Sequence, residues 1–398
     1  MISLEEAQEF VLSGCPRGEE TTVPVDEARL LVTSTGLHAA GAIPPFDNTA
    51  MDGFAVRSAD VADAPTTLRI VDTLAAGAAP SRAVEAGEAI RIMTGAPIPP
   101  GADSVVMVEL TETAGDDVTV VQSVPEGNHI RPAGDDVREG DLVFEAGTVL
   151  DAAHLGVCTS IGVYDVPVYR RPRVGVISTG DELVDAPVPL EMGQIRDSNR
   201  HTLLALVAAM GADAVDLGLI ADDEALIRDA MIQGAQSCDA VITSGGVSMG
   251  DFDFVKKVLD EIGDMRWMQV AIKPAKPLAF GTIDGTPVFG LPGNPVSSMV
   301  SFELFARPGL RKMMGYPNPH NRTLTAVAGA NLPRRADGKI HFARVVAEAG
   351  TDGRYRVQFA GGQGSHQLSA MASANALAIV PDGDGISIGE DVQVLFTR

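Results

Sequence analysis

The feature that most constrains this fold is a regular alternation of strand-like and helical runs that begins at Arg173 and continues for about 145 residues. Parallel strands need crossover connections, so this alternation predicts a mostly parallel sheet with helices on both faces. The predicted strands are 174–178, 214–220, 239–243, 267–272 and 287–291, and the predicted helices are 199–210, 223–233, 252–262 and 295–314.

The rest of the chain follows other patterns. Ser3 and Glu6 form a possible capping box and predict a helix at the start, and we expect further helices over 25–33 and 151–161. Short β-rich runs separated by Gly, Pro and Asp predict a small β domain, and residues 322–398 predict a barrel-like module of five or six strands. The β-rich runs are 67–74, 89–94, 104–110 and 118–123.

These patterns predict a multidomain α/β plus β protein with four parts. We expect a discontinuous helical domain (1–45 and 142–168), an inserted β domain (46–141), the α/β domain (169–317) and a C-terminal β-barrel domain (318–398).

Charge and cysteine content exclude several classes of protein. The chain has 30 Lys and Arg against 53 Asp and Glu, a net charge of −23, which disfavours binding to nucleic acid or to anionic membranes. Its three cysteines form no C-x-x-C pair, which excludes a zinc ribbon, an iron–sulfur cluster and a disulfide framework. No secretory or membrane-spanning segment is evident, so we expect a cytoplasmic protein.

Three predicted strands of the α/β region run into glycine-containing loops. Ligands in open parallel sheets bind beyond the carboxyl ends of the strands, where glycine amides and helix N-termini attract anions. Three such loops predict a phosphate site, although each alone could be an ordinary tight turn. The candidate binding residues of these loops are Ser244, Gly245, Gly246, Ser248, Pro292, Gly293, Asn294, Pro295 and Ser297.

Two lysines strengthen this interpretation. All six lysines follow residue 255, and Lys273 and Lys276 lie in Ile272-Lys-Pro-Ala-Lys-Pro277. The prolines favour an extended, polyproline-like course, which would place both ammonium groups on one side about 9 Å apart. Such a pair could hold a diphosphate or two separate anions, or it could be two solvated side chains.

Carboxylates near glycine-rich turns or helix starts indicate a metal. They coexist with phosphate when Mg²⁺ bridges them, so the sequence predicts a magnesium–nucleotide type of substrate. Asp222 and Asp253 could instead complement helix N-termini. The candidate acids are Asp52, Asp136, Glu182, Asp222 and Asp253.

Other motifs are absent or weak. There is no P-loop, and no histidine pair has metal-ligand spacing. Gly246-Val-Ser-Met-Gly250 fits a nucleophile elbow, so a serine hydrolase at Ser248 is an alternative. The long loop around Ser248 and the lack of a His-Gly-Gly segment argue against it.

The motifs in their order resemble the molybdopterin molybdenumtransferase family, the MoeA and gephyrin E-domain type, over essentially the whole chain. The resemblance is carried by 45–57, 91–96, 100–103, 134–136, 178–183, 197–200, 244–248, 272–277 and 290–297. It implies a molybdopterin-adenylyltransferase-like α/β domain and a homodimer whose site lies in a cleft shared between subunits. The implied reaction inserts molybdate into adenylylated molybdopterin with release of AMP and depends on Mg²⁺.

The resemblance also implies roles for particular residues. The implied metal ligands are Glu182, Asp222 and Asp253, and Arg344 and Ser365 would lie in a pocket near molybdate. The adenylyltransferase that supplies the substrate is a possible partner, and a non-catalytic pterin-nucleotide carrier or scaffold is the alternative function. The implied catalytic residues are Asp52, Thr94, Asp136, Glu182, Asp222, Asp253, Lys273 and Lys276.

Two positions depart from the family pattern. Ala275 stands where the family has glycine, and a positive φ at this position would cost about 1 kcal/mol. Phe54 stands where tyrosine is common, which removes a hydroxyl group.

Overall fold

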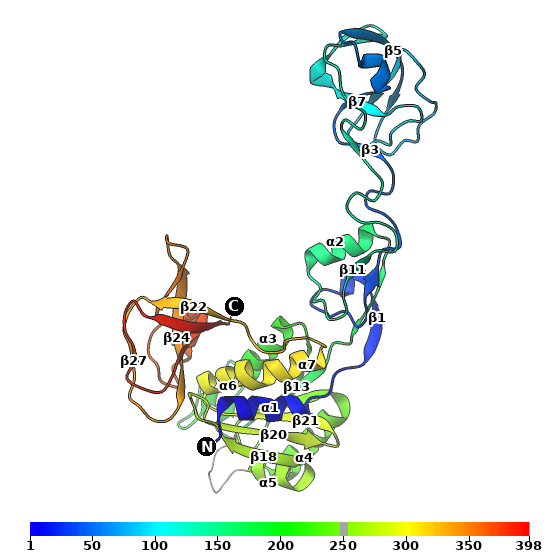
Figure 1. Ribbon diagram of the computed structural model, residues 1–398. Helices are drawn as coiled ribbons and strands as arrows, with labels where there is room; N and C mark the ends of the chain where they lie inside the picture. The colour runs from blue at the N-terminus through cyan, green and yellow to red at the C-terminus, as the bar shows by residue number, and fades with distance from the viewer. Residues whose placement is uncertain (247–253, 398) are drawn as a thin grey trace.

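The computed structural model describes residues 1–246 and 254–397. The chain is elongated (Figure 1): an α/β body lies beside the C-terminal barrel, and a β-sheet module lies at the far end of a thin connection. Within the described ranges, no helix combines the length and hydropathy needed to cross a bilayer.

The α/β body is built on a six-stranded sheet in the order β16-β13-β17-β21-β20-β18. The first four strands are parallel, as predicted, while β20 and β18 are antiparallel. The bounds are β16 (Asp213–Ile220), β13 (Arg173–Thr179), β17 (Ala240–Ser244), β21 (Thr286–Leu291), β20 (Pro277–Ile283) and β18 (Asp264–Gln269).

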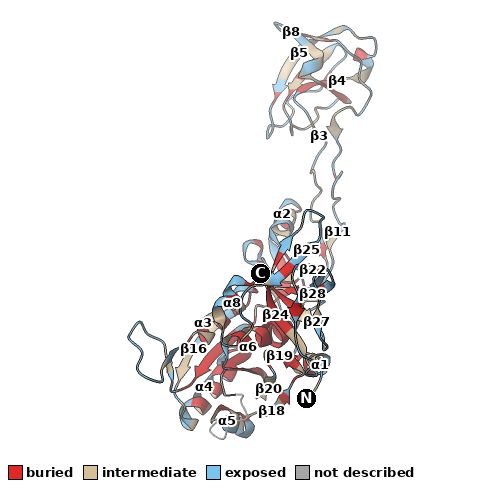
Figure 2. Cartoon of the chain, turned by 90° about the vertical axis from the view of Figure 1, so that its left-hand side faces the viewer, coloured by how far each residue is buried: buried red, intermediate tan, exposed pale blue. Residues whose placement is uncertain are grey.

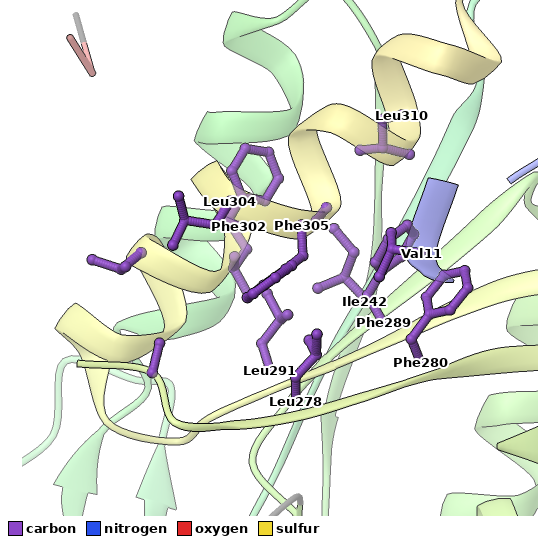
Figure 3. Close-up of a cluster of buried hydrophobic side chains, with 14 of the residues drawn as sticks. Val11, Ile242, Leu278, Phe280, Phe289, Leu291, Phe302, Leu304, Phe305 and Leu310 are labelled. Carbon is purple, nitrogen blue, oxygen red and sulfur yellow. The ribbon is translucent and has the colours of Figure 1, made fainter. Parts of the chain in front are cut away.

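Helices cover both faces of this sheet. One hydrophobic cluster packs α1 (Leu4–Gly14), α3 (Asn199–Ala209) and α6 (Pro295–Ser301) against the sheet, and another packs α4 (Glu224–Ser237) and α5 (Phe254–Ile262). Figure 3 shows Val11 of α1 and Phe289 of β21 in the first cluster. The predicted helix 295–314 is continuous in α6, a π-helical turn (Phe302–Ala306) and α7 (Arg307–Met313).

The prediction near the N-terminus is partly wrong. Ser3 caps α1 by accepting a hydrogen bond from the Glu6 amide, but α1 packs in the α/β core rather than in a separate helical unit. The helix expected over 25–33 is only a 3₁₀ turn (Val25–Glu27), because Leu30 has φ +65° and the following residues pair with distant strands. The helix predicted over 151–161 is α2 (Ala152–Ser160), capped by Asp151.

The far module contains a six-stranded sheet in the order β7-β4-β6-β5-β9-β8. Figure 2 shows its buried strands as a small core separate from that of the body. A short β3–β10 pair and an Ile43–Val137 bridge lie towards the connection. The bounds are β3 (Asn48–Thr49), β4 (Gly53–Val56), β5 (Thr66–Leu74), β6 (Glu88–Ile92), β7 (Ser104–Met107), β8 (Thr111–Ala114), β9 (Asp117–Val120) and β10 (Ile130–Arg131).

The C-terminal strands close into a barrel, because β24 pairs with both β25 and β26 in the ring β24-β25-β22-β28-β26. The strand β19 (Ile272–Lys273), which comes from the body, pairs with β24. The barrel elements are β22 (Thr323–Ala328), β24 (Ile340–Ala349), β25 (Tyr355–Phe359), α8 (Leu368–Ser373), β26 (Ala376–Val380) and β28 (Asp391–Phe396).

Four small ladders complete the described structure. They are β1 (Glu20–Pro24) with β12 (Asp165–Tyr169), β2 (Leu37–His38) with β11 (Leu142–Phe144), β14 (Leu183–Val184) with β15 (Ile195–Arg196), and β23 (Leu332–Pro333) with β27 (Gly385–Ile386). Apart from the assignment of α1 to a helical domain, the domain boundaries given above stay predictions.

Candidate active site

The ends of β13, β17 and β21, three neighbouring parallel strands, come together at one edge of the sheet. The Gly245 amide donates to the Leu291 carbonyl at 3.1 Å. A Cβ added at Gly245 would lie 3.3 Å from the Thr179 carbonyl oxygen, and one added at Gly293 would lie 3.7 Å from Gly245 Cα. The structure therefore brings the three predicted loops together.

The loop after β17 has a backbone that favours glycine. Gly245 and Gly246 have φ of +100° and +68°, in the left-handed region where a side chain is strained. The Gly245 amide is taken by the Leu291 carbonyl, whereas the Gly246 amide has no acceptor among the described residues and can bind a ligand. Ser248 and Asp253, which were predicted for this loop and the helix that follows, lie outside the described residues.

An asparagine that the sequence analysis did not single out joins two of these loops. Asn199, at the start of α3, donates from Nδ2 to Ser244 Oγ at 2.8 Å and to the Gly293 carbonyl at 2.7 Å. Its only sequence signal was its place in the 197–200 motif at a predicted helix start. Asp197, two residues earlier, is 4% exposed and accepts hydrogen bonds from Ser178 Oγ and Arg200 Nε.

The third loop leads into α6, whose first turn contacts the barrel. Pro295 occupies the first turn of the helix, and Asn294 is the N-cap residue but its side chain makes no capping bond. The Val296 amide donates to the Ser365 carbonyl at 3.2 Å, so predicted residues from the body and the barrel lie side by side. Pro292 and Ser297 are buried beside them.

Arg344 on β24 is a buried cation. It is 1% exposed and donates from Nη2 to the carbonyls of Gly362 at 2.8 Å and Gly364 at 3.1 Å, while Nε has no partner among the described residues. Within residues 1–246 and 254–397 no carboxylate pairs with Arg344, and burial lowers its pKa. An uncompensated buried charge of this kind favours an anion.

A cavity of about 290 Å³ lies next to this arginine. Most of its charged lining is basic, and Lys273 reaches it from the body. The charged and titratable lining residues are Lys273, Arg334, Arg335, Asp337, His341 and Arg344.

The extended course predicted for the lysine segment is wrong. Ala275 has φ +72°, far from polyproline geometry, and the Val270 amide donates to the Lys276 carbonyl at 2.8 Å. The chain turns here because β18 and β20 are antiparallel neighbours, with Gln269 opposite Pro277. Lys276 is exposed, and the described contacts link neither lysine to the glycine loops.

Three acids lie near one another beyond the ends of β13 and β16. The Asp222 amide donates to Asp181 Oδ1 at 3.0 Å. Burial raises the pKa of Asp222, and the negative charges of Asp181 and Glu182 raise it further. Among the described residues, no three His, Cys, Asp or Glu side chains are arranged to hold a metal ion.

The remaining predicted residues are remote from this edge. Asp52 and Thr94 lie in the far module, where the Thr94 amide and hydroxyl each donate to Asp52 Oδ1 at 2.7 Å. These hydrogen bonds lower the pKa of Asp52. Asp136 lies on the connection, where its amide donates to the Ile43 carbonyl. Figures 1 and 2 both show the module well separated from the body, so one chain does not bring these residues to the glycine loops.

Three family models match: "MoeA N-terminal region (domain I and II)" over residues 2–162, "Probable molybdopterin binding domain" over 175–312, and "MoeA C-terminal region (domain IV)" over 325–397.

Curated relatives and a solved structure align over nearly the full length. The molybdopterin molybdenumtransferase of Haemophilus influenzae is 38% identical over 99% of this chain and 98% of the relative. Molybdopterin molybdenumtransferase 2 of Mycobacterium tuberculosis is 39% identical over 99% of each chain. The crystal structure of the molybdopterin biosynthesis MoeA protein of Pyrococcus horikoshii has a TM-score of 0.83 at 30% identity and covers 100% of both chains.

Proposed function

The chain belongs to the MoeA family of molybdopterin molybdenumtransferases, and on this basis we propose that it inserts molybdate into adenylylated molybdopterin and releases AMP. The observation that carries the proposal is the meeting of the three strand-end loops at Gly245 and Gly293. Backbone amides and a helix N-terminus at one sheet edge are suited to the phosphates of such a substrate. Ser244 and the Gly246 amide hold phosphate oxygens, while Gly245, whose amide pairs with the Leu291 carbonyl, shapes the turn of the loop. The N-terminus of α6 adds the partial positive charge of its dipole.

Molybdate binds in the cavity beside Arg344. The guanidinium is buried without a carboxylate partner within the described ranges, so an oxyanion supplies the missing negative charge. Lys273 adds a second positive charge from the body. Ser365 lies between this cavity and α6, because Arg344 holds the carbonyl of the neighbouring Gly364 and Val296 holds that of Ser365.

The acids beyond β13 and β16 are the proposed place for Mg²⁺, with Asp253 as the further ligand that the described residues lack. Burial raises the pKa of Asp222, and the charges of Asp181 and Glu182 raise it further, so a divalent cation would stabilise the ionised carboxylate. Glu182 and Asp222, together with Asp253, are the proposed ligands, and bound Mg²⁺ would neutralise charge on phosphate oxygens. The chain itself orients the substrate and excludes water, and no covalent nucleophile is needed.

A second copy of the chain supplies Asp52, Thr94 and Asp136. Within one chain the far module does not reach the body, so a far module that contributes to this site belongs to another copy. Charge supports this arrangement. Residues 46–141 contain 17 acidic and six basic residues, a net charge of −11, whereas residues 266–344 contain 11 basic and three acidic residues, a net charge of +8. Opposite charges on the two regions favour docking between copies.

The test is turnover by the purified chain. Adenylylated molybdopterin, molybdate and Mg²⁺ should give AMP and a cofactor that activates a molybdenum enzyme lacking its own. Lys273→Ala should lower the yield about tenfold or more, since it removes a charge at the oxyanion cavity. Binding of the adenylylated substrate without AMP release would instead favour the carrier function.

A further inference from the structure

The hydrogen-bond direction between Asn199 and Ser244 is fixed by a third group. A carbonyl oxygen only accepts hydrogen bonds, so the amide nitrogen of Asn199 must face the Gly293 carbonyl, at 2.7 Å. The same nitrogen lies 2.8 Å from Ser244 Oγ. Both amide protons of Asn199 are therefore donated, and Ser244 Oγ is an acceptor in this pair.

This direction leaves the Ser244 proton free for another acceptor. A hydroxyl group has a single proton and can accept with its lone pairs. Ser244 is 3% exposed, and no acceptor for its proton is found among residues 1–246 and 254–397. A buried donor with no acceptor is costly unless a ligand pairs with it. The neighbouring Gly246 amide, for which the described residues provide no acceptor, is a second donor at this place and indicates that the ligand is an anion.

We infer that Asn199 is a positioning residue that holds the Ser244 hydroxyl as a hydrogen-bond donor to a phosphate oxygen of the substrate. The inference rests on the phosphate-binding role proposed above for Ser244. Asn199 itself touches the loops rather than the anion, and so acts through Ser244.

The first turn of α3 is built to hold Asn199 in place. Arg200 is 3% exposed and forms ion pairs with Asp197, Asp185 and Asp216. Asp197 also accepts hydrogen bonds from the Arg200 amide and from Ser178 Oγ of β13. The helix start is therefore fixed to the strand whose end forms the first loop, which leaves Asn199 little freedom to turn away.

The experiment is a double-mutant cycle with inorganic pyrophosphate as the probe, measured by calorimetry on the full chain. Asn199→Ala and Ser244→Ala should each weaken binding about tenfold or more, because each removes a hydrogen bond to a charged group. The double variant should bind no more weakly than Ser244→Ala alone. Gln233→Ala, an exposed amide on α4, is the control and should bind as the wild type does.

A purely structural role gives a different pattern. If Asn199 only ties the two loops together, Asn199→Ala will weaken binding in the Ser244→Ala background as well, and the inference is overturned. It is also overturned if Asn199→Ala binds like the wild type, or if the wild type binds no pyrophosphate. Should Asn199→Ala fail to fold, Asn199→Asp keeps the shape but reverses the Ser244 bond, and should weaken binding at least as much.

The cycle separates this inference from the proposed function. Coupled effects on pyrophosphate binding without AMP release by the wild type would refute the function and leave the inference standing. Normal AMP release with additive effects would refute the inference alone.

Discussion

Arg344 differs from the other buried arginines in the part of the chain that the structure describes. Arg200 pairs with three aspartates, Arg307 with Glu303, and Arg334 with Asp337 and Asp382. Within residues 1–246 and 254–397, the Arg344 side chain has only carbonyl partners and its Nε is unpaired. An incoming oxyanion would therefore compensate the charge of Arg344 more fully than that of the other three arginines.

Arg344→Met should raise the dissociation constant of molybdate about tenfold or more, because it removes this charge while keeping most of the side-chain volume. Calorimetric titration with molybdate measures the change. Arg344→Lys should recover part of the affinity, and Arg354→Met, which breaks an exposed pair with Asp391, should have no effect. Unchanged molybdate binding by a folded Arg344→Met would contradict the assignment.

The pH dependence of the melting temperature should reveal the ionisation of the Asp222 carboxyl group. Its pKa is raised above 3.8 in the folded state, so the ionised carboxylate destabilises the fold at neutral pH. This destabilisation disappears as the pH falls through the folded pKa towards 3.8.

Asp222→Asn should therefore raise the melting temperature at pH 7 in metal-free buffer, and the difference from the wild type should vanish near pH 3.8. Asp229→Asn, an exposed acid on α4, is the control. An equal melting temperature of Asp222→Asn and wild type at pH 7 would mean that burial and the neighbouring acids do not destabilise this carboxylate.

At the scale of elements, the π-helical turn between α6 and α7 is supported from outside the helix. Gln8 of α1 donates from Nε2 to the Leu304 carbonyl at 3.0 Å. Gln8→Leu should leave this carbonyl unpaired and lower the free energy of unfolding by about 1–3 kcal/mol. Urea unfolding measures the loss, and Glu9→Leu, on the exposed side of the same helix, should change it much less. Equal losses would show that α1 contributes packing alone.

Sequence periodicity predicted helices and strands best where burial in the core determines the spacing of apolar residues. Strands β13, β16, β17 and β21 and helices α3, α4 and α6 were expected within a few residues. Strand β20 was missed, although Asp284-Gly285, with φ of +48° and +85°, is the kind of dipeptide that marks a hairpin. The helix over 25–33 failed because pairing of Val32 with Val149 and of Thr33 with Val168 outweighed local propensity.

The candidate site was predictable only in part, for a related reason. Glycine-containing loops after parallel strands can be recognised from the local sequence, and in the structure these three loops lie together. The turn at Ala275 depends on the antiparallel β18–β20 pair, and the Asn199 bridge depends on the relative placement of three loops. Neither the turn nor the bridge leaves a pattern in a single sequence. The sequence did predict that alanine at position 275 would carry a cost if φ were positive there, and the structure has φ +72°.

At the scale of the whole molecule, the separation of the far module from the body predicts complementation between chains. Co-expressed Asp52→Ala and Lys273→Ala variants, each strongly impaired alone, should recover about a quarter of wild-type AMP release. Random pairing makes half of the dimers mixed, and each mixed dimer has one intact site of two. Dimers in which both chains carry the same substitution provide the control. No recovery in isolated mixed dimers would mean that Asp52 and Lys273 do not act in one shared site.

Strand β19 couples the barrel to the body in a particular way. Lys273 is in register with His341 on β24, three residues before Arg344. This pairing fixes the spacing between the lysine and the arginine. Phe342, Leu377 and Leu395 of the barrel pack in the same hydrophobic core as the sheet, so the barrel is held in place against the body. Both cations therefore keep a set distance from the glycine turns, and a substitution that loosens this shared core would disturb the oxyanion site without touching either cation.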